Sequence, residues 1–191
     1  TFFSFNPSLI GKVVPACWES ASPVQVHQAR LAGVRKLMGS LIESVGDGDQ
    51  ASVILATATR LHASLTPVIK AQEFSGRGLY AAHHYALVSE FSQECSEDPL
   101  FTLWVTITLL REYRGDGHIA ALVSHGLSGL EAGVLDCATG RAWRPSAARR
   151  SRGWSAEEWR TASANLTNEG LLSDESDLAT LTGAGQDLKA S

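Results

Sequence analysis

A cluster of arginines in the last third of the 191-residue sequence is the feature best suited to bind an anion. Its members fall within 12 residues that contain no acid: Arg141, Arg144, Arg149, Arg150 and Arg152. Planar guanidinium groups bind phosphate oxygens in pairs. With Trp143 and Trp154 close by, the stretch predicts a phosphate-contacting loop beside a DNA-reading helix. The alternative is a solvated loop whose charge is balanced elsewhere, because the net charge of the chain is −4.

The helix expected after this loop is the candidate for reading DNA bases. Ser155 and Glu158 have the spacing of a capping box that starts this helix, as Ser128 and Glu131 do for a helix before the loop. Its polar residues supply the candidate base readers: Arg160, Thr161, Ser163, Asn165 and Asn168, of which Arg160 and Asn165 are our predicted contacts. However, Glu157 and Glu158 in the first turn would repel phosphate at the end that meets the major groove. A protein that keeps this motif only for packing or dimerisation is therefore the competing interpretation.

A second motif, REYRGDGH at residues 111–118, combines carboxylates, guanidinium groups and an imidazole. Gly115 would end one helix and Asp116 would cap the next. His118 would then lie in a first helical turn, where the helix dipole favours the neutral imidazole that can act as a base or bind a ligand. The predicted ligand-binding residues are Tyr80, His83, Arg111, Arg114, Asp116 and His118. The alternative, which we favour, is an ion-pair network that holds a tight turn.

Other chemistries have little support in the sequence. Neighbouring residues on a helix point about 100° apart, so His83 and His84 cannot easily bind one metal ion, and we predict no metal and no cofactor. The cysteines (Cys17, Cys95 and Cys137) are far apart and odd in number, which indicates reduced thiols in the cytoplasm. No apolar stretch reaches the length of a membrane span. Enzymatic activity is left open.

The elements that would position these residues are mainly helical. Apolar residues recur at helical spacing over most of the chain. We expect a helical region at residues 1–115, for dimerisation or ligand binding, and a winged-helix domain at residues 116–191. The wing would be a short two-stranded hairpin of Leu171–Leu172 and Leu178–Leu181. The aromatic opening, with Phe2, Phe3 and Phe5, should pack against the helical region.

Two stretches resemble the end of the MarR-type winged helix-turn-helix: LTNEGLL at residues 166–172 and LTGAG at 181–185. In that family a recognition helix ends in a Gly-Leu pair, a wing turns, and a similar stretch begins the next helix. The whole chain, including residues 111–118 and 152–155, resembles an uncharacterised actinobacterial family described as helix-turn-helix. Members of that family usually carry a helical segment before the residues that correspond to 1–7, so the resemblance implies that this chain lacks it.

These features together predict a MarR-like transcription regulator or DNA-associated protein with a small-molecule pocket in the helical region. The alternative is a binding protein or enzyme that is derived from a winged helix and does not bind DNA. The expected partners are duplex DNA, a small apolar or aromatic ligand, and either a second copy of the chain or an N-terminal fragment.

Overall fold

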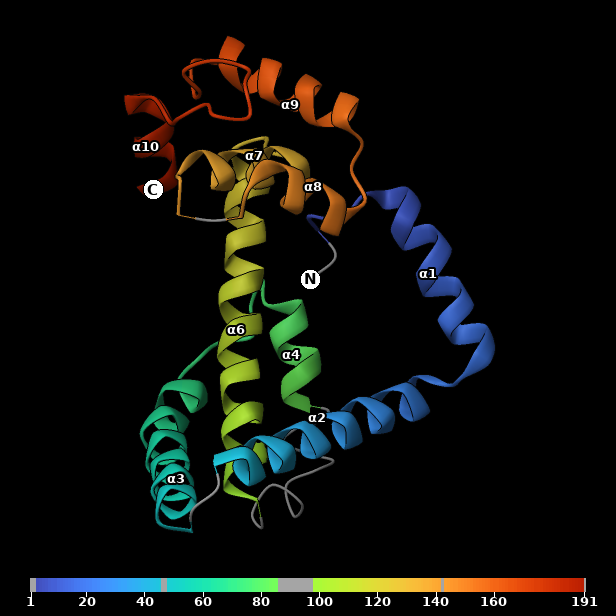
Figure 1. Ribbon diagram of the computed structural model, residues 1–191, viewed down its shortest axis with the longest axis vertical. Coiled ribbons are helices and arrows are strands. Elements are labelled where there is room, and N and C mark those ends of the chain that lie inside the picture. Colours follow the sequence, from blue (N-terminus) through green and yellow to red (C-terminus); the bar gives the residue numbers. More distant parts are fainter. Residues whose placement is uncertain (1–2, 46–47, 86–97, 142, 191) are drawn as a thin grey trace. The chain divides into compact units, whose positions relative to one another are not determined.

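The computed structural model describes residues 3–45, 48–85, 98–141 and 143–190 (Figure 1). The described part of the chain is helical, as predicted, and contains no β-strand. The helices are α1 (Pro7–Ser20), α2 (Pro23–Val45), α3 (Gly48–Lys70), α4 (Gly78–His84), α6 (Pro99–Ser124), α7 (Gly129–Ala138), α8 (Pro145–Arg152), α9 (Ala156–Asn168) and α10 (Gly183–Ala190). Within these residues, no helix is both long enough and apolar enough to cross a membrane.

The contacts divide the chain into two compact units. One unit, here called the helix-turn-helix unit, contains residues 1–19 and 121–191, and the other, the helical unit, contains residues 20–120. The long helix α6 contributes to both. The predicted boundary between residues 115 and 116 falls inside α6, and a division of the chain at that point stays a prediction.

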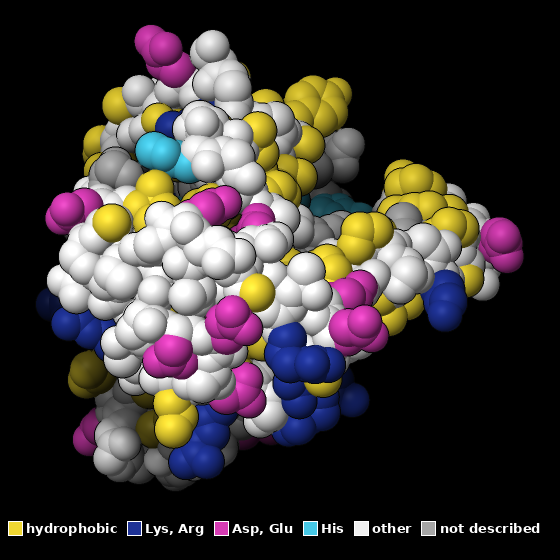
Figure 2. Space-filling view, turned by 90° about the horizontal axis from the view of Figure 1, so that it is seen from above, with side chains coloured by type: hydrophobic (Ala, Val, Ile, Leu, Met, Phe, Trp, Pro, Cys, Tyr) yellow, Lys and Arg dark blue, Asp and Glu magenta, His cyan; other side chains and the backbone are white. Residues whose placement is uncertain are grey.

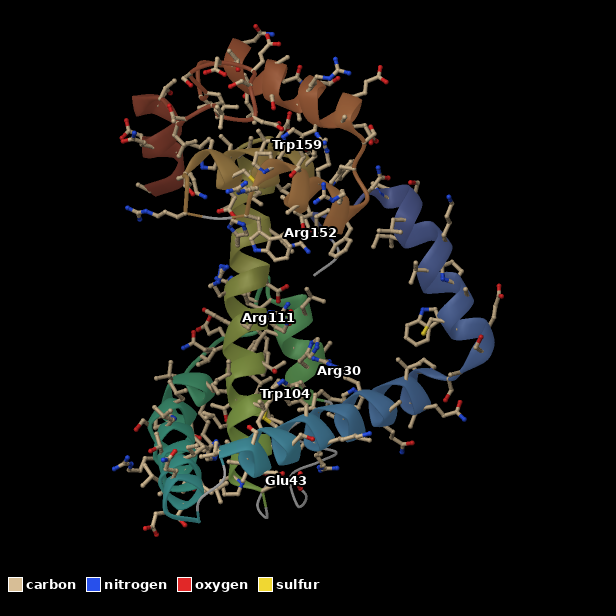
Figure 3. All side chains as sticks on the ribbon, in the orientation of Figure 1. Arg30, Glu43, Trp104, Arg111, Arg152 and Trp159 are labelled. Atoms are coloured by element: carbon tan, nitrogen blue, oxygen red, sulfur yellow. The ribbon has the colours of Figure 1, made fainter. Side chains whose placement is uncertain are left out.

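The helical unit packs α2, α3 and α4 around the first half of α6. Its buried core contains Leu31, Ile69, Tyr80, Phe101, Val105 and Leu109. At one edge the Arg30 guanidinium of α2 lies 5.1 Å from the ring centre of Trp104 in α6 (Figure 3). Apolar burial of this kind, at about 25 cal/mol per Å², is the main force that holds the unit together.

Helix α6 corrects the prediction of a helix break at Gly115. The helix runs without interruption from Pro99 to Ser124, so Asp116 is not a cap of a new helix and His118 is not in a first turn. The glycine at position 117 has a packing reason: a Cβ there would collide with the guanidinium of Arg77. Arg77 also donates to the carbonyl oxygen of Tyr113 at 2.9 Å. A glycine inside a helix costs roughly 1 kcal/mol, but at position 117 it leaves the room that the Arg77 guanidinium needs to reach Tyr113.

The helix-turn-helix unit has its own core, built on α7 and α9. Its buried residues are Leu127, Val134, Leu135, Trp159, Ala162, Leu166 and Leu172. Both predicted capping boxes are present: Ser128 with Glu131 starts α7, and Ser155 with Glu158 starts α9. Because each cap satisfies orphan N–H groups of the first turn, the two helices begin where the sequence predicts.

The predicted two-stranded wing is wrong. Between α9 and α10 the described chain forms one isolated antiparallel bridge, between Leu172 and Leu181, and no strand. Backbone hydrogen bonds flank this bridge, from the N–H of Ser173 to the carbonyl oxygen of Thr180 at 2.9 Å and from the N–H of Thr182 to that of Leu171 at 3.1 Å. Side chains add to them: Asp174 accepts from the backbone N–H of Ser176 at 2.7 Å, and Ser173 Oγ accepts from the N–H of Thr180 at 3.0 Å. The polar segment is thus stabilised by this one bridge together with local side-chain hydrogen bonds, and the pairing extends no further.

The arginine-rich stretch is also not the loop that we predicted. Residues 145–152 form α8, which begins with Pro145 and is followed by Gly153 in the left-handed conformation. Proline is well suited to the first helical position because its missing N–H has no partner there in any helix. Arg144, Arg149, Arg150 and Arg152 therefore lie on or beside a helix that directly precedes α9.

Candidate nucleic-acid interface

Helices α8 and α9 form a helix-turn-helix with a short turn, residues 153–155. Gly153 has φ +75°, a conformation that residues with a Cβ adopt only at a cost. A Cβ at this position would also lie 2.9 Å from Cδ2 of Leu9 in α1. The glycine is needed both to turn the chain and to let α1 approach. Connections of three or four residues that contain glycine are typical of the motif.

The start of α9 is fixed by its capping box. Glu158 Oε2 accepts from the backbone N–H of Ser155 at 2.9 Å and from its hydroxyl at 2.7 Å. Glu158 Oε1 accepts from the amide Nδ2 of Asn6 at 3.0 Å. These hydrogen bonds, those from Ser155 above all, lower the pKa of Glu158 below its ordinary value. One of the two acids that we expected to repel DNA is therefore engaged inside the unit.

The residues before α1, 3–6, contact the turn between α8 and α9, and we call this segment the clasp. Asn6 is buried, and its backbone N–H donates to the carbonyl oxygen of Arg152 at 2.9 Å. The indole N–H of Trp154 donates to the carbonyl oxygen of Ser4 at 2.8 Å. The guanidinium of Arg152 lies 4.8 Å from the ring centre of Phe5. In Figure 3, Arg152 lies at the end of α8 next to the start of the chain.

This clasp is the main functional feature that the sequence interpretation missed. We expected the aromatic opening to pack on the helical region, with its phenylalanines mostly buried. Instead it packs on the helix-turn-helix unit, and Phe3 and Phe5 are only partly buried. The usable signal was the pair Asn6–Pro7, because Asn caps helices and Pro follows it at the first helical position. The side chain of Asn6 indeed accepts from the backbone N–H of Ser8 at 3.0 Å.

Helix α9 buries one face and exposes the other. Trp159, which Figure 3 labels, enters the core together with Ala162 and Leu166. Ser163 is buried as well and is therefore not available to read bases. The exposed polar residues recur every three or four positions and form one stripe: Glu157, Arg160, Thr161, Asn165 and Asn168. Residues at this spacing share one face of a helix. The stripe is the surface that a major groove would meet.

The arginines on and beside α8, and Arg160 of α9, are mostly unengaged. In the part of the chain that the structure describes, the guanidinium groups of Arg141, Arg144, Arg149, Arg150 and Arg160 make no hydrogen bond or ion pair. Arg152 differs, because it lies on the ring of Phe5. On the face shown in Figure 2, basic side chains gather in patches beside acidic ones rather than covering the surface. A local cluster of free guanidinium groups can bind phosphates even on a chain with net negative charge.

The opposite end of α9 is acidic. Glu169 follows the helix, and Asp174, Glu175 and Asp177 lie in the exposed turn after it. The pKa of Asp174 is lowered, mainly by hydrogen bonds from Ser176, which favours its charged form. Phosphate contacts are therefore expected on the α8 side of the motif and not on the turn after α9.

A shallow hollow of about 410 Å³ separates the starts of α7 and α9. Its lining includes Ser128, Leu130, Glu131, Glu157, Thr161 and Asn165. The carboxylates make it unsuitable for an anion and suitable for amino or other donor groups. The exposed stripe of α9 and this hollow share three residues, so they are one continuous surface.

The predicted ligand-binding residues are only partly together. Asp116 is buried and accepts from the backbone N–H of Tyr80 at the start of α4, at 2.9 Å. Tyr80 is fully buried and donates to the carbonyl oxygen of Ile69. Burial, and then the neighbouring Tyr113, raise the pKa of Tyr80. These contacts are those of a structural core.

The remaining predicted ligand residues lie on or near the surface. Arg111 is exposed and pairs with the adjacent Glu112 at 3.2 Å, and Arg114 and His118 are also exposed. His83 contacts the carbonyl oxygen of Leu79 through Nδ1, at 2.9 Å. Among the described residues, no group of three or more His, Cys, Asp or Glu side chains is arranged to hold a metal ion. A ligand site in the helical unit stays a prediction.

Comparison with known proteins gives one match. A family model described as a helix-turn-helix family matches residues 1–191, the whole chain. Neither the curated proteins nor the solved structures gave a match.

Proposed function

The chain belongs to a helix-turn-helix family, and from this premise we propose that it is a transcription regulator that binds duplex DNA through α8 and α9. Family membership alone suggests DNA binding; the surface that does it is our proposal. In helix-turn-helix docking the second helix enters the major groove by its N-terminal end, and the first crosses the backbone. Helix α9 is then the reading helix, and α8 carries the phosphate contacts.

The observation that carries this proposal is the set of unengaged arginines on and beside α8. Four of the five arginines in residues 141–152 have guanidinium groups with no partner among the residues that the structure describes, so no structural role explains them. Phosphate oxygens are their best-matched partners. The clasp from residues 3–6 supports the same reading, because it fixes the turn and hence the direction of α9.

The finer parts of the proposal follow from the resemblance to MarR-type proteins. The order of elements supports this relationship: α8 and α9 are joined by a short turn, and a second turn, which the Leu172–Leu181 bridge closes, leads to α10. By this analogy the protein would act as a homodimer on paired half-sites, and the helical unit would hold a small apolar or aromatic effector.

Fluorescence anisotropy with labelled duplex DNA tests the phosphate contacts. Binding should weaken steeply with salt, since each contact adds about 0.9 to the slope of log K against log salt. Replacing Arg149 and Arg150 by Ala should flatten that slope by roughly two units. The matched control replaces Arg60 and Arg114, which carry the same charge in the helical unit, and should leave the slope unchanged. Absence of binding at low salt, or equal flattening by both variants, would overturn the proposal.

A second candidate function is small-molecule binding without DNA. The acid-lined hollow at the starts of α7 and α9 favours it, because carboxylates there oppose phosphate and attract amines. Native mass spectrometry of the purified chain separates the two candidates. A co-purified amine together with no affinity for DNA would support this second function, and the apo mass together with salt-sensitive DNA binding would support the first.

A further inference from the structure

The two acids in the first turn of α9 differ in their surroundings. Glu158 is committed to Ser155 and Asn6. Glu157 is exposed and lines the hollow, and its carboxylate makes no hydrogen bond or ion pair with any residue that the structure describes. The capping box needs an acid only at position 158, so it does not explain the carboxylate at 157.

A free carboxylate at the DNA-facing end of a reading helix selects among bases. It can only accept hydrogen bonds. In the major groove guanine presents two acceptors, thymine presents an acceptor and a methyl group, and adenine pairs its amino donor with the N7 acceptor. Cytosine presents the N4 amino donor without an acceptor beside it. Cytosine is therefore the base that a carboxylate recognises with the least repulsion.

The neighbours of Glu157 extend this pattern. Arg160, one turn further, is exposed and unengaged, and guanidinium groups pair with O6 and N7 of guanine. The hydroxyl of Thr161 donates to the carbonyl oxygen of Glu157 at 3.1 Å, so its donor is used within the helix. A cytosine donor for Glu157 and guanine acceptors for Arg160 are both available at a G·C pair or at adjacent G·C pairs.

We propose that Glu157 is a specificity-determining residue that reads the N4 amino group of cytosine in the major groove, with Arg160 reading guanine. This inference rests on the proposed DNA binding by α8 and α9. The carboxylate also repels phosphate and acceptor edges, so it weakens binding to every sequence that lacks a cytosine at that position. Glu157 acts by rejecting wrong sites as well as by binding the right one.

The substitution Glu157→Gln separates this role from a simple charge effect. Glutamine keeps the size of the side chain, loses the negative charge and gains a donor. Glu169→Gln is the matched control, because it removes the same charge at the other, exposed end of α9. Since the Glu157 carboxylate has no partner in the described structure, its replacement removes only the interaction with the helix dipole and should shift the thermal melting curve only slightly.

The experiment first selects duplexes from a random library with the wild-type chain. The affinities of the selected duplexes, and of duplexes that differ from them by one base pair, are then measured for wild type, Glu157→Gln and Glu169→Gln. Wild type should enrich a cytosine at one position. Glu157→Gln should reduce the preference for that base by about 5- to 150-fold, the value of one good base contact. It should also raise affinity for unrelated DNA, while Glu169→Gln keeps the wild-type preference.

The outcomes separate the two claims. If DNA is enriched but Glu157→Gln selects the same bases as wild type, or if both variants change affinity alike, the inference is wrong and the proposed function stands. If no duplex is enriched at low salt, the proposed function fails and the inference fails with it.

Discussion

Gly153 should be the most demanding of the left-handed glycines in the helix-turn-helix unit. Replacing it by Ala puts a Cβ at φ +75°, which costs about 1–2 kcal/mol. The new atom would also lie 2.9 Å from Cδ2 and 3.3 Å from Cβ of Leu9. Overpacking of this kind costs about 1–3 kcal/mol more. Gly153→Ala should therefore lower the free energy of unfolding by about 2–5 kcal/mol.

Gly140 provides the matched control. It has φ +68°, and nothing lies within 4 Å of its Cβ position, so Gly140→Ala measures the backbone cost alone. Urea unfolding followed by tryptophan fluorescence should place Gly153→Ala below Gly140→Ala by the overpacking energy. In a Leu9→Ala background that difference should largely vanish. Equal costs for the two glycines, or a gap that survives Leu9→Ala, would refute the contact between α1 and the turn.

The remaining predictions concern the clasp, the helical unit and a half-buried thiol. Asn6→Ala removes the cap of α1 and the amide bond to Glu158, so urea unfolding should show a loss of about 1–3 kcal/mol. Asp116→Ala leaves the start of α4 without its acceptor and should cost about 1–3 kcal/mol, whereas Arg114→Ala, exposed on the same helix, should stay within about 0.5 kcal/mol of wild type in the same assay. Burial first, and then nearby acids, raise the pKa of Cys137 to about 11. Its thiol should thus stay protonated at pH 8 and react with iodoacetamide far more slowly than free cysteine, with a rate that rises up to about pH 11.

Local signals in the sequence predicted local structure. Ser128 with Glu131 and Ser155 with Glu158 are capping boxes in the structure as well, because their hydrogen bonds join residues three apart and need no tertiary partner. The helical fold class was predictable for the same reason: the apolar spacing is helical over most of the chain.

The sequence interpretation missed features that depend on contacts between distant parts of the chain. Gly115 looked like a helix end, but α6 continues through it. Gly117 leaves a space that is filled by the guanidinium of Arg77, 40 residues earlier in the chain. The clasp from Asn6 to Glu158 joins residues 152 positions apart, which no local pattern reveals.

The predicted wing failed at the level of side chains. Two short apolar stretches, Leu171–Leu172 and Leu178–Leu181, flank a polar turn as in a hairpin, but the backbone pairs only around one bridge, Leu172 with Leu181. Asp174, Glu175 and Asp177 make this turn acidic, so phosphate contacts are expected on α8 and not on this turn.

The most direct test of the central claim is site-specific photocrosslinking to duplex DNA. A benzophenone side chain at Asn165 would lie on the exposed stripe of α9, and one at Leu37, which is 57% exposed in α2, would lie in the helical unit. Docking by α8 and α9 predicts a crosslink from position 165 that disappears at high salt, and none from position 37. A bound complex that crosslinks from position 37, or that gives no crosslink from position 165, would contradict the account.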